Sequence, residues 1–195
     1  MRADYSVLLD ACVLIPMPLS DSLLRMAEAP RLYLPKWSDA IMQEVTRNLI
    51  GKFKVEPAKA QRREDEIRRH FPEAWVEGFE PLIEAMTNDP KDRHVLAAAV
   101  RSHSALIVTY NRRDFPKSSL DQFDIEVQGP STFLRGLYDL DPGLTVHKLH
   151  EQAKAIGITL ERLLLRLSKN VPGFVQYFAE EQGISLASEQ TTSRQ

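Results

Sequence analysis

The sequence predicts an α/β fold in which a parallel sheet is flanked by helices, followed by a small α-helical extension. Short apolar runs, typical of strands buried on both faces, alternate with longer segments whose apolar residues have helical spacing. The 195 residues are 43% hydrophobic and 27% charged, a globular composition that excludes a largely disordered chain. From about residue 139 the apolar residues have helical spacing and no further strand candidate follows. This change predicts a sheet domain over 1–138 and a helical extension over 139–195.

The first third of the chain contains two strand candidates. Three apolar residues precede Asp10, which predicts a buried strand over 7–10 that ends on a carboxylate. Residues 32–34 predict a second strand, closed by Pro35 because proline has no amide hydrogen to donate. Capping residues and helical spacing predict helices over about 20–27 and over 38–51.

The middle of the chain contains the clearest strand. Residues 105–110 are almost continuously apolar or β-branched and lead into a polar loop at 111–114. Asp89-Pro90-Lys91-Asp92 opens a helix that continues to about residue 100. A weaker strand is expected at 125–127 and a helix at 131–138.

The extension is expected to be helical over 144–156, 160–167 and 174–181, with Gly157 and Pro172-Gly173 as breaks. Its middle helix carries an apolar stripe of Leu160, Leu163, Leu164 and Leu167. Such a stripe needs a partner surface, either the protein's own helices or a groove on a second copy or partner. The polar residues 188–195 are expected to fray.

Four acidic residues fall at strand ends or helices of this pattern: Asp10, Glu44, Asp92 and Asp114. Ligands of parallel sheets bind beyond the carboxyl ends of the strands, and carboxylates enclosed among apolar neighbours need a partner. Each acid also has a purely structural explanation, such as a helix cap, a solvated helix face or a salt-bridged turn. Their joint occurrence favours a site, and oxygen ligands without clustered Cys or His favour Mg²⁺ or Mn²⁺ over zinc.

Composition excludes several classes of protein. The single cysteine, Cys12, excludes a disulfide framework and a cysteine-based zinc cluster. A net charge of −2 requires any nucleic-acid contact to use a local basic patch. The basic segment 52–69 is either such a patch or a solvated helix face. No apolar run approaches the ~20 residues of a membrane helix, and no secretory signal is visible, so we expect a cytoplasmic protein with no membrane association.

Four segments together resemble PIN-domain proteins, in particular the VapC-like ribonuclease toxins of type II toxin–antitoxin systems. They are VLLDACVL (7–14), WSDAIMQEV (37–45), DPKDRHVLAAA (89–99) and IVTYNRRDF (107–115). Each motif alone is loose, but the four stand in family order, and their spread covers most of residues 1 to about 138. The C-terminal segment resembles a helical extension found in a subset of these toxins.

The resemblance implies a Rossmann-like sheet, dependence on Mg²⁺ or Mn²⁺, and endonucleolytic hydrolysis of RNA by a metal-activated water. It implies Asp10, Glu44, Asp92 and Asp114 as catalytic acids, with Asp10, Asp92, Asp114 and Asn111 as metal ligands. The family often has aspartate where this chain has Asn111, which leaves open whether one or two ions bind. Supporting or substrate-binding roles are expected for Thr109, Arg93, Arg112 and Arg113.

The implied partners are an RNA substrate and a cognate antitoxin protein, and a homodimer is also compatible with the sequence. A rival hypothesis is a catalytically inactive PIN-fold module that binds nucleic acid or protein, to which the Asn111 departure points. An aspartate-based phosphotransferase would want a second aspartate two residues after Asp10, where Cys12 stands. Measuring Mn²⁺ binding by the wild type and by Asp10→Asn separates the nuclease from the inactive module.

Overall fold

A five-stranded parallel sheet organises the chain, which confirms the predicted fold class. The computed structural model describes residues 5–186. Its strands are β1 (Ser6–Leu9), β2 (Leu34–Ser38), β3 (Trp75–Val76), β4 (Leu106–Val108) and β5 (Glu126–Gln128). They lie in the order β3-β2-β1-β4-β5, and every neighbouring pair is parallel. The strand order therefore reverses between β1 and β4, whose carboxyl ends flank the place where open α/β sheets bind ligands.

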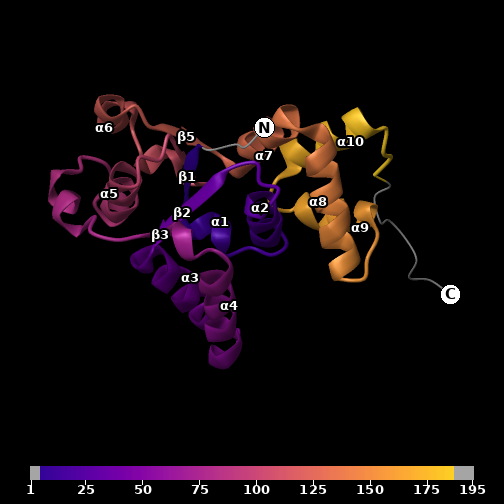
Figure 1. The fold of residues 1–195 in the computed structure, drawn as a ribbon, viewed down its shortest axis with the longest axis horizontal. Helices are drawn as coiled ribbons and strands as arrows, with labels where there is room; N and C mark the ends of the chain where they lie inside the picture. Colours follow the sequence, from indigo (N-terminus) through magenta and orange to yellow (C-terminus); the bar gives the residue numbers. More distant parts are fainter. Residues whose placement is uncertain (1–4, 187–195) are drawn as a thin grey trace.

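Ten helices surround the sheet within the described residues. They are α1 (Ala11–Leu14), α2 (Leu19–Ala27), α3 (Asp39–Gly51), α4 (Pro57–His70), α5 (Arg93–Arg101), α6 (Lys117–Leu120), α7 (Pro130–Leu140), α8 (Pro142–Ala155), α9 (Leu160–Leu167) and α10 (Pro172–Gln182). In Figure 1, α5 and α6 lie to the left of the sheet, α3 and α4 below it, and α7 to α10 to the right. None of the helices within residues 5–186 combines the length and the apolar character needed to cross a bilayer.

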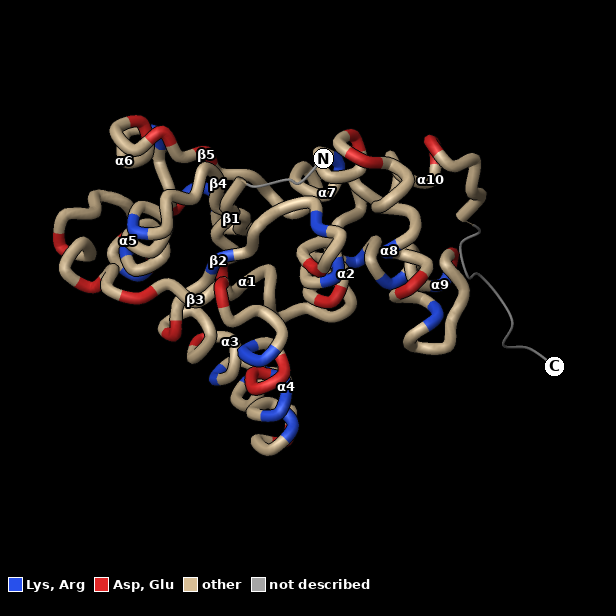
Figure 2. The backbone as a smooth tube through the Cα atoms, in the orientation of Figure 1, with Lys and Arg blue, Asp and Glu red and all other residues tan. Residues whose placement is uncertain are grey.

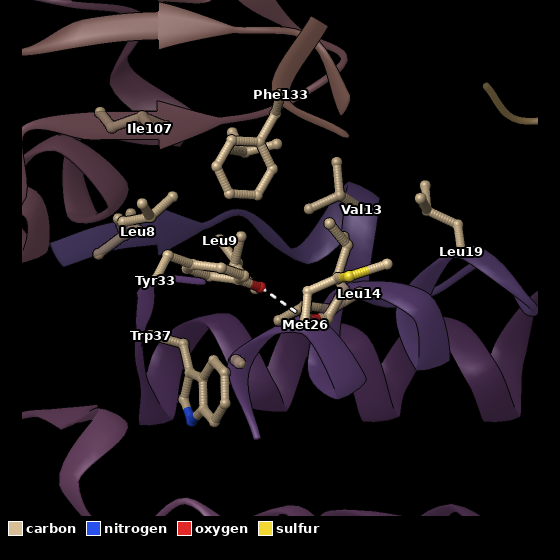
Figure 3. Packing of buried hydrophobic residues seen from close by; sticks show 14 of the residues in the cluster. Leu8, Leu9, Val13, Leu14, Leu19, Met26, Tyr33, Trp37, Ile107 and Phe133 are labelled. Carbon is tan, nitrogen blue, oxygen red and sulfur yellow. Dashed lines mark hydrogen bonds between the residues drawn. The ribbon is translucent and has the colours of Figure 1, made fainter. Parts of the chain in front are cut away.

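The hydrophobic core is one continuous cluster that includes the strands and the helices on both sides. Leu8, Leu9 and Ile107 of the central strands are fully buried, as their apolar runs predict. Tyr33 meets Phe133 of α7 edge to face, with ring centroids 5.0 Å apart, and its hydroxyl donates a hydrogen bond of 2.8 Å to the Leu23 carbonyl (Figure 3). Tyr33 thus connects α2 and α7 within the core.

The second strand differs from the sequence prediction. We expected it at 32–34 with Pro35 as its end, but β2 begins at Leu34 and passes through Pro35, which lies opposite Val7. Pairing with β3 starts only at Trp37, so at Pro35 one edge of β2 is unpaired. A proline is tolerated at such an edge because its missing amide hydrogen is not needed there.

The clearest predicted strand is also shorter than expected. β4 ends at Val108 instead of Tyr110. The Thr109 amide still donates to the carbonyl of Gln128 at the end of β5, but the Tyr110 amide donates to Cys12 Sγ at 3.3 Å. The backbone therefore leaves the sheet where it meets the segment that follows β1.

The C-terminal helices form where the helical spacing predicts them. The four leucines of the α9 stripe are all 7% exposed or less and pack against α8 and α10, so the reading in which the stripe docks within the chain is confirmed. Ser22 Oγ of α2 donates a hydrogen bond of 2.7 Å to Gln152 Oε1 of α8, which connects the C-terminal helices to the sheet region. The boundary at residue 138 stays a prediction, and the expected frayed tail, 188–195, lies outside the described residues.

Candidate active site

Asp10 sits at the carboxyl end of β1, directly before α1. Its amide donates to the Val108 carbonyl of β4 at 3.2 Å, which holds the two strand ends together. The residue is only 5% exposed, because apolar neighbours precede and follow it. A buried carboxylate of this kind is costly unless polar groups compensate its charge.

Two side chains on neighbouring segments supply that compensation. Thr109 Oγ1 donates a hydrogen bond of 2.6 Å to Asp10 Oδ2, and Cys12 Sγ donates to the same oxygen at 3.0 Å. Thr109 Oγ1 also accepts a hydrogen bond from the Asn111 amide at 3.0 Å. Within residues 5–186 both bonds go to Oδ2 and none to Oδ1, so the second oxygen stays available for a ligand.

Cys12 is a hydrogen-bond donor in this network and not a nucleophile. Burial, and then the charge of Asp10, raises the pKa of its thiol to about 12. The thiol is therefore protonated at neutral pH, whereas a nucleophilic cysteine needs the thiolate.

Asp92 lies at the end of the 3-10 turn η3 (Pro90–Asp92), directly before α5. It is 8% exposed, and its Oδ2 is buried without a hydrogen-bond partner in the described part of the chain. Burial raises its pKa to about 7, and the charge of Asp10 and interaction with the Asp114 carboxyl act in the same direction. The dependence on Asp10 and Asp114 indicates that the three carboxyl groups share one electrostatic environment.

Asp114 approaches the same place from the 3-10 turn η4 (Arg112–Asp114), after β4. Its carboxylate forms an ion pair with Lys91 Nζ at 2.9 Å, and this contact lowers the pKa of Asp114. The Asp89 amide also donates to the Asp114 carbonyl at 3.1 Å, which connects η4 to the start of η3. Asp114 therefore stays ionised while Asp92 titrates near neutrality.

Glu44 is not drawn into this cluster. It lies half-buried in α3, which starts where β2 ends and so belongs to the same edge of the sheet. No hydrogen bond or ion pair between residues 5 and 186 connects its carboxylate to the three aspartates, and the pKa of Asp92 does not depend on it. No three Asp, Glu, His or Cys side chains of the described residues converge into a ready-made metal cluster.

The other predicted site residues lie along the rim. An open pocket of about 440 Å³ is lined by Tyr110, Asn111, Arg112, Arg113 and Asp114. The three residues Asn111, Arg112 and Arg113 are exposed, so their side chains are free to meet a ligand from solvent. Arg93 is half-buried instead, and its Nε donates to the Asn88 carbonyl at 3.5 Å.

A larger pocket of about 690 Å³ lies beyond Arg112, between β5 and the α6 segment. Its lining contains Arg112, Lys117, Asp121 and Glu126, but neither Asp10 nor Asp92. Size alone therefore does not identify the site. The buried carboxylates at the β1–β4 reversal are the stronger indicator.

Three residues near the site have surroundings that the sequence did not predict. Cys12 stands two positions after Asp10, and Lys91 stands beside Asp92, so both were visible in the sequence, but neither was expected to contact an acid. Asn88 is 2% exposed and neither polar atom of its side chain has a partner within residues 5–186. No local signal distinguishes it from an ordinary loop asparagine.

The basic segment of α4 is mostly engaged within the protein. Arg68 Nη2 donates to Asp39 Oδ1 at 2.7 Å, and the Cζ atom of Arg68 lies 3.5 Å from the Trp75 ring centroid. Arg63 Nη2 donates to the Leu14 carbonyl at 2.6 Å. Figure 2 shows acidic and basic residues together along this helix. These contacts favour the reading of α4 as a solvated, internally paired helix.

Comparisons with known proteins agree with the fold. A family model described as a PIN domain matches residues 6–113, more than half of the chain. The chain is also 46% identical over 67 residues to a protein of Mycobacterium tuberculosis (strain ATCC 25618 / H37Rv) named "Putative ribonuclease VapC50". That match covers 34% of this chain and 40% of the relative's length. No solved structure gives a significant match.

Proposed function

Because the chain belongs to the PIN domain family, we propose that it is a metal-dependent endoribonuclease and the toxin of a type II toxin–antitoxin pair. The observation that carries the proposal is the pair of buried carboxylates, Asp10 and Asp92, at the β1–β4 reversal of the sheet. Two buried carboxyl groups in one electrostatic environment are what a cation-dependent site needs and what a purely structural site avoids. RNA as substrate class rests on the family and on the printed name of the mycobacterial relative.

The residues present fit a hard divalent cation. Asp92 Oδ2 is buried without a partner, Asp10 Oδ1 is free of hydrogen bonds within residues 5–186, and the nearby donors are oxygen atoms. Mg²⁺ and its substitute Mn²⁺ bind through one or two carboxylates and several waters, so a preformed cluster of three acids is not required. Asp10 and Asp92 would hold the ion, with Asp114 and Asn111 at the rim.

The chain's own residues then have separate tasks. Thr109 and Cys12 fix Asp10 by its Oδ2, and Lys91 holds Asp114 as a carboxylate. Arg112 and Arg113 are exposed beside these acids and would contact the phosphates of the substrate. When bound, the ion supplies an activated water and stabilises negative charge on the phosphodiester.

Glu44 belongs to the proposal through the family resemblance. Its helix starts at the end of β2, the neighbour of β1, so it stands at the correct edge of the sheet. Glu44→Gln tests its role. A loss of cleavage comparable to that of Asp10→Asn supports Glu44 as an acid of the site, whereas cleavage at the wild-type level by Glu44→Gln excludes Glu44 from the site.

The decisive experiment measures cleavage and metal binding in parallel. Wild-type protein with Mg²⁺ or Mn²⁺ should cut a mixed RNA pool, and EDTA or Asp10→Asn should abolish the cut. Asp65→Asn is the matched control, because Asp65 is exposed on α4 and an asparagine can keep its hydrogen bond from Gln61. Calorimetry should show Mn²⁺ binding that Asp10→Asn weakens at least tenfold.

The rival hypothesis predicts a different outcome of the same experiment. An inactive PIN-fold module would bind RNA or a protein without cutting RNA in either metal. The departure at Asn111, which has an amide where the family often has a carboxylate, is the feature that favours it. Cleavage by the wild type and its absence in Asp10→Asn exclude this alternative.

The proposed partners are an RNA and a cognate antitoxin protein, and the proposed location is the cytoplasm. An antitoxin would neutralise the acidic site most directly by inserting an arginine among the carboxylates, since charge-assisted bidentate bonds to carboxylates are strong. A homodimer remains a further proposal, tested by the mass of the purified protein in solution.

A further inference from the structure

Tyr110 is held at both ends beside the acidic site. It follows Thr109 at the end of β4, and its amide donates to Cys12 Sγ, which itself donates to Asp10 Oδ2. At the other end, its hydroxyl donates a hydrogen bond of 3.0 Å to the carbonyl of Asn170, in the turn between α9 and α10. The ring is therefore fixed relative to the acids by a contact that the C-terminal helices provide.

The same ring remains open to solvent. Tyr110 is 42% exposed and lines the rim pocket together with Arg112 and Arg113. Among the aromatic residues that the described chain exposes most, Tyr5, Phe53 and Tyr110, only Tyr110 is bonded into the network around Asp10. An exposed, immobilised ring loses little conformational entropy when a ligand covers it.

The chemistry of this rim matches single-stranded RNA. Nucleobases stack on aromatic rings, and arginines beside such a ring contact the phosphates that connect the bases. Because the site lies at a strand end where phosphodiester chemistry is proposed, a base next to the bound phosphate would reach the ring.

We propose that Tyr110 is a nucleobase-stacking residue for single-stranded RNA, and that the C-terminal helices position its ring through Asn170. This inference rests on the proposed function, because it needs an RNA substrate. It gives the α9–α10 turn a role in substrate binding although none of the proposed acids lies in the C-terminal segment.

The test compares two ligands of equal charge in the Asp10→Asn background, which prevents cleavage. One is a ten-nucleotide oligoadenylate, and the other is a ribose-phosphate chain of the same length without bases. Adding Tyr110→Leu should weaken binding of the oligoadenylate by about 5- to 150-fold, the range found for single stacking residues. It should change binding of the base-free chain less than about twofold, because electrostatic contacts are untouched.

Two further variants separate stacking from a structural role. Tyr110→Phe keeps the ring and removes only the bond to Asn170, so it should weaken binding of the oligoadenylate by about 2- to 10-fold and by less than Tyr110→Leu, and an unchanged affinity would remove the positioning role of Asn170. Phe53→Leu, at an exposed ring beyond α3, is the matched control and should leave both ligands unaffected. Circular dichroism shows whether each variant is folded.

The outcomes are distinguishable. If Tyr110→Leu weakens the binding of both ligands equally, or of neither, the stacking inference is overturned. RNA cleavage by the wild type would still support the proposed function in that case. If the Asp10→Asn protein binds neither ligand and the wild type cuts no RNA, both fail. A loss confined to the ligand with bases supports the inference.

Discussion

Replacing Asp92 by asparagine should stabilise the metal-free protein above neutral pH. Asp92 is buried, and burial together with the charge of Asp10 raises its pKa from 3.8 to about 7. Between these values the unfolded chain has already released the proton while the native protein retains it. The free energy of unfolding therefore falls as the pH rises through this window, and the contribution of Asp92 is lost above about pH 7.

The magnitude follows from the same two values. At 1.36 kcal/mol per pH unit, the interval between 3.8 and about 7 corresponds to at most about 4 kcal/mol. Water at the open rim screens part of this, so we expect Asp92→Asn to gain about 1–2 kcal/mol over the wild type at pH 8. At pH 4 the difference should nearly vanish, because Asp92 is then protonated in the native protein.

Urea denaturation in EDTA, followed by circular dichroism at pH 4, 6 and 8, measures this difference. Asp65→Asn is the control, because the side chain of Asp65 is exposed and should leave the pH dependence unchanged. The reasoning is refuted if Asp92→Asn is less stable than the wild type at pH 8, or if the wild type does not lose stability relative to the variant between pH 4 and pH 8. Added Mg²⁺ should reverse the order by stabilising only the wild type.

Three other predictions concern growth arrest, the hydrogen bond from Thr109 to Asp10 and the packing of the C-terminal helices. Expressed alone in a bacterial host, the wild type should arrest growth and Asp10→Asn should not; equal growth of both strains would argue for the inactive module. Thr109→Val should weaken Mn²⁺ binding about 10- to 100-fold, since the bond to Asp10 Oδ2 is lost, whereas Thr109→Ser should retain it; calorimetry decides. Leu163→Ala should lower the free energy of unfolding by about 2–5 kcal/mol because Leu163 is fully buried, while Ala at the exposed Ile156 should cost under about 0.5 kcal/mol; matching urea midpoints would contradict this.

The local pattern was enough to predict most of the architecture. The apolar run before Asp10 predicts β1 because a strand buried on both faces needs no polar alternation. Ser38 predicts the start of α3, and its hydroxyl indeed accepts a hydrogen bond from the Ile41 amide. Both signals depend on neighbours within a few residues, which is why the sequence alone reveals them.

The sequence could also indicate which acids to consider, but not how they are related in space. Asp10 and Asp92 are separated by most of the sheet domain, and only the adjacency of β1 and β4 and the turn before α5 brings them into one electrostatic environment. Whether Glu44 joins them depends on the path of α3, which periodicity does not define. Distances between such elements are determined by strand order and helix packing.

The remaining features were decided by tertiary structure alone. β2 passes through Pro35 because β3 pairs only farther along, a fact that no local signal contains. Cys12 became a donor to Asp10 because the chain turns into α1 directly after β1, and Lys91 became the partner of Asp114 because separate loops meet at the sheet edge. The sequence by itself indicated most of the strands and helices and the candidate acids, since these depend on nearby residues. The course of β2, the end of β4, the protonation of those acids and the placement of Tyr110 depend on burial and contacts that exist only in the folded chain.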